Sequence, residues 1–512
     1  MFIRPITKLK FQSFMPATDK KQASIAPTVS TSPSFAPSFF GESKVYSDQI
    51  QALKLDMKEF PEDIKYRKQL MINAGKNPDE FYKLRSIIGL DEIKSIMSEF
   101  NENEDVYSVG FEDENIKNKT IRANWHTHTL ASDGYMSAQE LLDKAAAYAD
   151  EAARVAKQKK EPFTIAITDH DTAESAKEAI EIISNNPLKY KNLRVVLGTE
   201  FTTYNNIATH ITNKPTSTHI LVYGIDPNEQ TFDEFIESTK LKKREISQKM
   251  INQANKTYRE AFNEKGDFFS LKEAKEFYNP LKKDILGIFI YMQKFIDTKL
   301  MLDEVVLKDP ILLGKLQQKE LPLYGYGLTG EMRDFFTQVD KTNKSRFAEE
   351  SIPMFLSDKL DMSEDEIKEI LKNAPQSDEY KKFKQNIKTD LNEYKRTITP
   401  KYDYMPTIKS LYEMLKVQPH TIIGIAHPLE TIAEIKDTPK RYEFLTDLYA
   451  QFKHQAREKA GFSEVYYQSY TEPLNDFKLK AGTKELLEKL SEGLFKTGSA
   501  DSHRTNIFKR LF

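Results

Sequence analysis

Six of the nine histidines in this chain lie in short blocks that also carry carboxylates. The blocks are His126-Thr127-His128 with Asp133, Asp169-His170-Asp171, Glu200, His219, His427, and Asp501-Ser502-His503. Imidazole nitrogens and carboxylate oxygens are the ligands that hold catalytic zinc, manganese and iron in proteins. The sequence therefore predicts a metalloenzyme.

The spacing of these residues is that of ligands on strands. Residues i and i+2 of an extended strand project to the same face, so His126 and His128 can grip one ion together. Asp501 and His503 repeat this spacing. Most of the blocks also adjoin short apolar runs, at residues 164–168, 193–197, 220–223 and 422–426. These runs predict strands with ligands at their ends, which is where β/α barrels place their catalytic groups.

The elements that must position the ligands alternate between strand and helix from residue 121 onward. We predict seven strands, one ending at residues 126–128 and the others at 164–168, 193–197, 218–224, 421–426, 463–467 and 495–499. Helices are predicted near residues 137–156, 173–183, 441–460 and 483–491, the first of them opened by a capping box at Ser137 and Glu140. The alternation predicts a parallel sheet and an α/β fold, a distorted (β/α)7 TIM-like barrel.

Around this barrel the sequence predicts three further parts. Residues 1–43 form a disordered tail, because its Ser, Pro, Ala and Thr cannot bury enough surface to offset chain entropy. Residues 44–118 form a helical N-terminal module, and the barrel itself is split into residues 119–226 and 418–512. Between them, residues 227–417 form a helical insertion. We expect the insertion to emerge near the mouth of the barrel and to cap the site, the alternative being a stabilising appendage.

Composition excludes several classes of function. The chain of 512 residues has no cysteine, so disulfides, cysteine nucleophiles and thiolate zinc sites are ruled out. This suits a reducing compartment, and we expect a cytoplasmic protein. A formal net charge of −2 gives no global reason to expect long nucleic acid as a partner. No unbroken apolar run approaches the length that spans a membrane.

The motifs resemble those of one family in both content and order. They are His126-Thr127-His128 with Ala131-Ser132-Asp133-Gly134, Ala166-Ile167-Thr168-Asp169-His170-Asp171-Thr172, Gly198-Thr199-Glu200, Thr218-His219-Ile220, Ala426-His427-Pro428, and Ser499-Ala500-Asp501-Ser502-His503. Together they resemble the polymerase and histidinol phosphatase (PHP) family of metal-dependent phosphoesterases. The resemblance covers residues 121–226 and 422–504 and does not reach the first 120 residues.

The resemblance implies a site with two or three divalent ions, manganese, zinc or iron. By this analogy one ion is held by His126, His128, Glu200 and Asp501. A second is held by His219, His427 and a bridging Glu200, and a third by Asp133, His170 and His503. Several relatives have a histidine where this chain has Asp133. Neighbouring divalent ions lower the pKa of bound water toward about 7, and the resulting metal-bound hydroxide is the expected nucleophile.

The resemblance also implies a reaction, the hydrolysis of a small phosphorylated substrate. The Ser-Asp-Gly and Thr-Asp-His-Asp-Thr blocks look like the branch that acts on nucleoside 3′,5′-bisphosphates and the 5′ ends of short RNA. Two alternatives stay open: an amidohydrolase-type carbon-nitrogen hydrolase, which also opens with His-x-His, and a PHP module that binds ligand without catalysis. Asp169 is expected to orient the imidazole of His170, and Arg504 to bind a substrate phosphate. A turn residue and a surface ion pair are the respective alternatives.

Overall fold

The computed structural model describes most of the barrel region and little of the insertion. It covers residues 40–55, 60–100, 123–132, 134, 136–156, 162–205, 211, 216–262, 405–432, 435, 438–467, 483–499 and 501, with short pieces between 266 and 389. Helix α1 (Phe40–Leu55) begins in a first compact unit, residues 1–48. All other elements named below belong to the second unit, residues 49–512. Across the described residues, no helix combines the length and apolar character that a membrane crossing requires.

Seven strands form one sheet in which each strand pairs with its neighbours in the chain. They are β1 (Ala123–Asn124), β2 (Phe163–Ile167), β3 (Leu193–Asn205), β4 (Thr216–Tyr223), β5 (Ile422–Ile425), β6 (Ala460–Tyr467) and β7 (Phe495–Ser499). The first and last strands also lie in contact, so the sheet curls into a nearly closed seven-stranded barrel. The expected α/β barrel and its seven strands are confirmed.

One strand runs against the predicted direction. β4 is antiparallel to both β3 and β5, whereas all other described pairs are parallel. The expectation of a fully parallel sheet was wrong at this strand. The reason is the connection from β3 to β4, residues 206–215, which is shorter than the dozen or more residues that a parallel crossover needs. β3 therefore continues past the barrel as a long strand and pairs with β4 as a hairpin.

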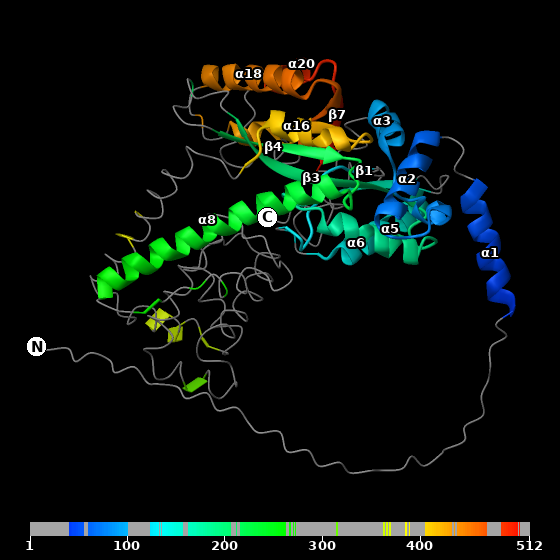
Figure 1. Cartoon of the computed structure of the whole chain (residues 1–512), viewed down its shortest axis with the longest axis horizontal. Helices are drawn as coiled ribbons and strands as arrows, with labels where there is room; N and C mark the ends of the chain where they lie inside the picture. The colour runs from blue at the N-terminus through cyan, green and yellow to red at the C-terminus, as the bar shows by residue number, and fades with distance from the viewer. Residues whose placement is uncertain are drawn as a thin grey trace, which may run out of the picture. The chain divides into compact units, whose positions relative to one another are not determined.

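Helices cover the outside of the strands on opposite sides. α5 (Ala138–Ala156) and α6 (Glu174–Asn185) lie together on one side, and α18 (Thr438–Ala456) and α20 (Thr483–Leu490) on the other (Figure 1). The predicted capping box opens α5, since the Glu140 amide donates to Ser137 Oγ at 3.2 Å and the Ser137 amide to Glu140 Oε2 at 2.8 Å. α5 and α6 bury their apolar faces in the main core, and each fully buried leucine or isoleucine there contributes about 1.5–3 kcal/mol.

The helices that precede the barrel share its core. They are α2 (Pro61–Asn73), η1 (Pro78–Leu84) and α3 (Leu90–Ser98). Leu70 and Leu84 are fully buried in the same apolar cluster as strands β2 and β3. The backbone of Val195 in β3 bonds to Ser86 and to Ile88, at 2.6 and 3.1 Å, so this segment adds to the edge of the barrel sheet. The predicted helices are present, and they pack as part of the barrel wall.

The insertion leaves the barrel at the end opposite to the one predicted. Because β4 is antiparallel, its last residue, Tyr223, pairs with Gly198, which precedes Glu200 in β3, and with Ile422 at the start of β5. The departure and return of the insertion therefore lie at the amino ends of the parallel strands, whereas the candidate ligands lie toward their carboxyl ends. The ends of the predicted range therefore lie away from the candidate ligands, although the Tyr204 amide donates to Pro406 O at 2.8 Å, so the returning segment passes beside the carboxyl end of β3.

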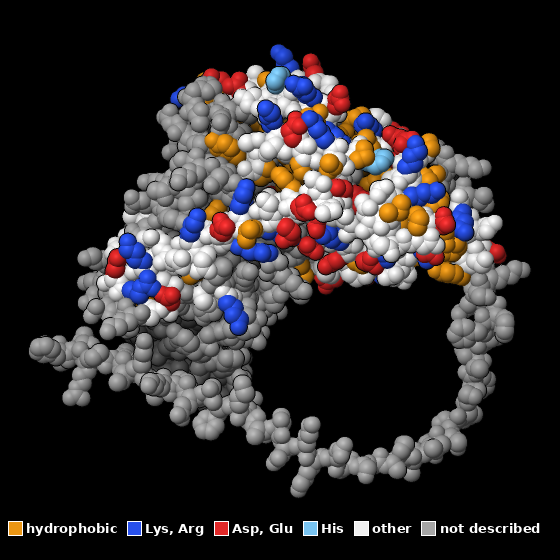
Figure 2. Space-filling view, in the orientation of Figure 1, with side chains coloured by type: hydrophobic (Ala, Val, Ile, Leu, Met, Phe, Trp, Pro, Cys, Tyr) orange, Lys and Arg blue, Asp and Glu red, His pale blue; other side chains and the backbone are white. Residues whose placement is uncertain are grey.

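The first helix of the insertion runs back toward the mouth. α8 (Gln230–Phe262) lies along α6, and ion pairs join Asp233 to Lys177 at 2.6 Å and Lys240 to Glu174 at 3.2 Å. A third pair joins its Lys243 to Asp171, beside His170. Beyond that pair α8 continues away from the strands (Figure 1). Figure 2 shows acidic and basic side chains intermingled on this face of the molecule.

Short elements complete the described fold. They are α16 (Ile408–Met414) and η3 (Leu415–Val417) before β5, α17 (Pro428–Thr431) after it, and η4 (Arg457–Lys459) before β6. Most of the predicted cap lies outside the described residues, so its placement over the site stays a prediction.

Candidate metal centre

The structure brings together seven of the nine predicted ligands at the carboxyl ends of the parallel strands. His126 and His128 follow β1, His170 follows β2, Glu200 lies in β3, His219 lies in β4, His427 follows β5 and Asp501 follows β7. Asp133 and His503 lie outside the described residues, and so does Arg504. Their roles as ligands and as phosphate contact stay predictions.

Glu200 is the hub of the cluster, and each of its two carboxylate oxygens serves a different group of imidazoles. Oε2 lies 3.0 Å from His126 Nε2, 3.3 Å from His128 Nε2 and 3.1 Å from His170 Nδ1. Oε1 lies 2.9 Å from His219 Nδ1 and 3.0 Å from His427 Nε2. The side chain of Glu200 is fully buried. One buried carboxylate therefore divides five imidazoles into two sets.

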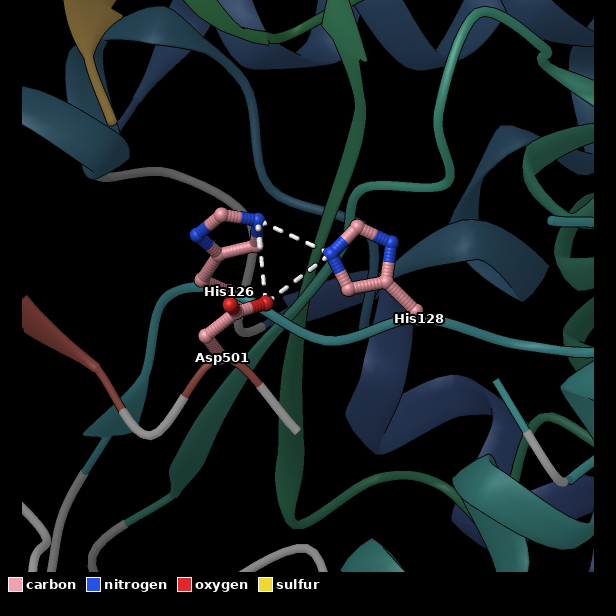
Figure 3. Close-up of side chains that lie close together, drawn as sticks. All are labelled: His126, His128 and Asp501. Atoms are coloured by element: carbon pink, nitrogen blue, oxygen red, sulfur yellow. Dashed lines mark hydrogen bonds and ion pairs between the residues drawn. The ribbon is translucent and has the colours of Figure 1, made fainter. Parts of the chain in front are cut away.

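His126, His128 and Asp501 form one three-residue group whose ligand atoms lie close enough together to hold an ion (Figure 3). The two Nε2 atoms lie 3.0 Å apart, and Asp501 Oδ1 lies 3.6 and 3.1 Å from the Nε2 atoms of His126 and His128. Thr127 points the other way, donating from its hydroxyl to Ala166 O at 2.6 Å. The alternation predicted from the i, i+2 spacing thus places both histidines on one side of the chain.

The second predicted set also lies together. His219 Nδ1 is 3.2 Å from His427 Nε2, and both nitrogens contact the same oxygen of Glu200. β4 runs in the unexpected direction, yet His219 pairs in register with Thr202, two residues past Glu200, and so stays at the level of the cluster. His170 lies with the first set, its ring 4.5 Å from that of His128. Its assignment to a third ion with Asp133 and His503 stays a prediction.

The donor set fits a divalent metal centre. Several imidazole nitrogens and carboxylate oxygens converge within hydrogen-bonding distance. Two neutral imidazoles whose nitrogens face each other can share at most one proton between those nitrogens. A cation among these atoms gives every lone pair a partner. Histidine with carboxylate suits zinc, manganese or iron, and the geometry does not choose among them.

The electrostatics of the cluster depend on the same groups. Burial alone lowers the pKa of His126, but the carboxylates of Glu200, Glu464 and Asp501 outweigh it and hold that pKa well above its ordinary value. Burial raises the pKa of Glu200, but the imidazoles of His170, His126 and His219 reverse this effect and hold it well below. The lowered pKa keeps Glu200 ionised at neutral pH.

Backbone conformation at the rim is unusual in three places. Asp171, His427 and Asp501 have positive φ angles of 50°, 23° and 43°. Residues without a glycine's freedom adopt such angles only where the surrounding structure holds them, and they gather at functional sites. Each of the three is a candidate ligand or the neighbour of one.

Asp169 does not orient His170 in the way predicted. Its carboxylate accepts hydrogen bonds from the Thr129 amide at 2.7 Å, the Thr129 hydroxyl at 2.8 Å and the Ser132 hydroxyl at 2.6 Å. Ser132 Oγ in turn lies 3.3 Å from His128 Nδ1. Asp169 therefore organises the loop after His128 and supports that ligand through Ser132.

Sequence reasoning missed one carboxylate that touches the cluster. Glu464, in β6, is fully buried, and its Oε1 and Oε2 lie 3.2 and 3.3 Å from His126 Nδ1. Its Oε2 also accepts the backbone amide of His427 at 2.8 Å. The available signal was an acidic residue inside an apolar strand, flanked by Ser463 and Val465, since a carboxylate is seldom fully buried without a specific partner.

The remaining histidines are outside the cluster or outside the described residues. The ring of His420 lies 5.3 Å from that of Tyr66 at the amino end of the barrel. His454 lies near the end of α18, and His210 is among the residues that the structure does not describe.

The chain shows limited similarity to known proteins. No protein-family model matches the sequence, and no curated protein matches it significantly. Among solved structures, an amidohydrolase from Chromobacterium violaceum with bound sulfate and no metal is 15% identical, with a TM-score of 0.34 over 75% of this chain and 88% of the other. A Bifidobacterium adolescentis protein named for metal-dependent phosphoesterase activity is 15% identical, with a TM-score of 0.35 over 76% and 90%. Neither similarity decides the reaction.

Proposed function

We propose that this protein is a metal-dependent hydrolase of the PHP type that cleaves small phosphomonoesters. The observation that carries the proposal is that the two carboxylate oxygens of Glu200 face different histidines. Its Oε2 faces His126, His128 and His170, and its Oε1 faces His219 and His427. A carboxylate that presents each oxygen to its own set of ligands suits a bridge between two divalent ions.

Paired ions supply a specific chemistry when they are bound. They lower the pKa of a water molecule and stabilise the attacking and leaving oxygens of an in-line displacement at phosphorus. This suits a phosphoester better than it suits an uncharged amide, because a phosphoryl group spreads negative charge over several oxygens.

The residues of this chain determine where a substrate can enter. His126, His128 and Glu200 are fully buried, whereas the side chains of His170 and His219 are 21% and 28% exposed. Their rings lie 5.2 Å apart, so the open side of the cluster lies over this pair. We propose that the phosphate approaches across His170 and His219, on the side where α8 pairs with Asp171.

The finer features of the proposal come from the motif resemblance. The substrates that it favours are nucleotides, such as nucleoside 3′,5′-bisphosphates, and the 5′ ends of short RNA, and the ions are two or three of manganese, zinc or iron. We place the activity in the cytoplasm, which suits a sequence without cysteine.

The test combines metal content with reaction class. Protein loaded separately with Mn²⁺, Zn²⁺ or Fe²⁺ is analysed for bound metal, then assayed against phosphomonoesters, nucleoside bisphosphates, 5′-phosphorylated oligoribonucleotides and a panel of amides. We expect two or three ions per chain and release of inorganic phosphate that carries solvent oxygen-18 after one turnover. Hydrolysis of amides alone would make the protein a carbon-nitrogen hydrolase, and bound metal without any turnover would support a non-catalytic module.

Glu200→Gln provides the decisive variant. Losing the bridging charge should remove two ions at once and abolish turnover. Glu181→Gln, an exposed glutamate on α6, is the matched control and should retain both metal and activity. Loss of a single ion in Glu200→Gln would contradict the bridge.

A further inference from the structure

Glu464 contacts two candidate ligands that belong to different sets. His126 faces Glu200 Oε2 and His427 faces Glu200 Oε1, yet both contact the carboxylate of Glu464. The contact with His126 is through the imidazole Nδ1, and the contact with His427 is through its backbone amide. The carboxylate of Glu464 thus contacts one residue of each set. In His126 it contacts Nδ1, whereas Glu200 faces Nε2.

The contact with His126 determines which ring nitrogen can bind metal. A carboxylate acceptor at Nδ1 holds the proton on that nitrogen and leaves the lone pair on Nε2. In His126 the Nε2 atom is the one that faces Glu200 and Asp501. Hydrogen bonding to Glu464 therefore selects the tautomer that can act as a ligand toward the cluster.

The contact with His427 holds an unusual backbone. His427 has a φ angle of 23°, outside the regions that most residues occupy. The amide of a residue in this conformation needs a fixed acceptor to keep its direction, and Glu464 Oε2 supplies one at 2.8 Å. The bond places the His427 ring where its Nε2 meets Glu200 Oε1.

The strand itself is irregular at this residue. The pairing of β6 with β7 shifts register between Glu464 and Tyr466, as at a β-bulge or a similar irregularity. Bulges re-aim side chains and are common next to active sites. On the other edge of β6, Ser463 pairs with Ile425, the last residue of β5, so Glu464 lies level with the segment that carries His427.

We propose that Glu464 is a positioning residue of the metal centre, which fixes the His126 tautomer and the His427 backbone together. The inference rests on the metal centre of the proposed function and is independent of which bond the enzyme cleaves. It implies that the two sets of ligands are coupled through one buried carboxylate in addition to Glu200.

Glu464→Gln tests this with almost no change in size. Glutamine lacks the negative charge and has one acceptor oxygen where glutamate has two, so it holds the Nδ1 proton of His126 less strongly while it accepts from the His427 amide. The matched control is Glu92→Gln, a buried glutamate bound by Arg67 and Arg85 in the wall of N-terminal helices. Both variants remove one buried negative charge, but only the first touches the cluster.

The readout is zinc affinity, measured by competition with a chromophoric chelator, together with ¹⁵N spectra of histidine-labelled, zinc-loaded protein. Glu464→Gln should weaken zinc binding by about 10–100-fold and alter the Nδ1–H signal of His126. Glu92→Gln should leave both unchanged, even where it lowers the temperature of unfolding. Glu464→Asp keeps the charge, and its loss of zinc affinity should be smaller than that of Glu464→Gln.

The outcomes separate this inference from the proposed function. Wild-type protein that binds no divalent ion would overturn both. Zinc affinity and His126 signals that are unchanged in Glu464→Gln, in a wild type that binds metal, would overturn the positioning role alone. An equal loss of affinity in Glu92→Gln would also overturn it, because the effect would then follow stability. If Glu464→Gln does not fold, Glu464→Asp decides, and wild-type zinc affinity and spectra in that variant would refute the role.

Discussion

Asp226 makes the stability of this protein depend on pH at the point where the insertion begins. The side chain is buried between β4 and α8, where it accepts from the Asn73 side chain at 2.7 Å and the Asn228 amide at 3.1 Å. Burial raises its pKa to about 6, and these hydrogen bonds offset only part of that shift. The folded protein therefore holds a proton on Asp226 at a pH where the unfolded chain has released it.

The sign and size of the effect follow from linkage. Between pH 3.8 and about 6 the folded state binds more protons than the unfolded state, so the free energy of unfolding falls as pH rises through this window. With these two pKa values, the contribution falls by about 1.4 kcal/mol between pH 5 and pH 7.5. Above pH 7 it is essentially constant.

Asp226→Asn removes this titration and isolates the contribution. Urea unfolding of the wild type and the variant at half-unit steps from pH 5 to 7.5 gives the difference in free energy of unfolding at each pH. We expect the wild type to lose about 1.4 kcal/mol relative to the variant across the series. Asp79→Asn, at an exposed aspartate of η1, should run parallel to the wild type. A constant difference, or one of opposite sign, would refute the reasoning.

Three further predictions concern the rim and the first helix of the barrel. Lys243→Met leaves Asp171 buried without its cation and should lower the free energy of unfolding by about 3 kcal/mol, measured with urea. The double variant with Asp171→Asn should lose less free energy of unfolding than Lys243→Met alone. Losses that add in the double variant would argue against the ion pair. Ser137→Ala removes a helix cap and should cost about 1 kcal/mol by the same measurement, with no effect on metal content. His126→Ala and Asp501→Ala should each abolish turnover and lower bound metal while far-ultraviolet circular dichroism stays that of the wild type; retained metal would exclude them as ligands.

The strands and most of the candidate ligands could be picked out from the sequence because their signals are local. An apolar run of four to eight residues marks a strand, and a histidine or acid at its end marks the rim. The last strand was predicted as residues 495–499, the bounds that the structure gives it. The pair His126 and His128 needed only the alternation of an extended chain. Asp133 and His503 lie outside the described residues and stay predictions.

Glu464 could not be assigned from local signals. Its partner His126 lies 338 residues away in the sequence, and nothing around residue 464 shows which side chain it will meet. The contact forms only when the barrel closes and brings β6 toward the end of β1, where His126 lies. Asp169 shows the same limit, since adjacency to His170 suggested one partner and the folded chain gave it Thr129 and Ser132.

The direction of β4 was the wrong prediction with the widest consequence. An apolar run of residues predicts a strand but carries no information on whether that strand is parallel or antiparallel to its neighbours. The ten residues between β3 and β4 were the available clue, being too few for a parallel crossover. Reversing β4 sends the base of the insertion to the far end of the barrel. Among the described residues of the insertion, α8 reaches the rim through the ion pairs that end at Lys243 and Asp171, and residues 406–407 lie beside Tyr204 of β3.

This route constrains how the insertion can act on the cluster. Asp171 accepts from the Thr202 amide at 3.2 Å through one carboxylate oxygen and pairs with Lys243 through the other, while its own amide donates to Glu200 O at 2.8 Å. A displacement of α8 therefore pulls on the residue next to His170 and on the strand that carries Glu200. Through this ion pair α8 contacts the segment that carries His170.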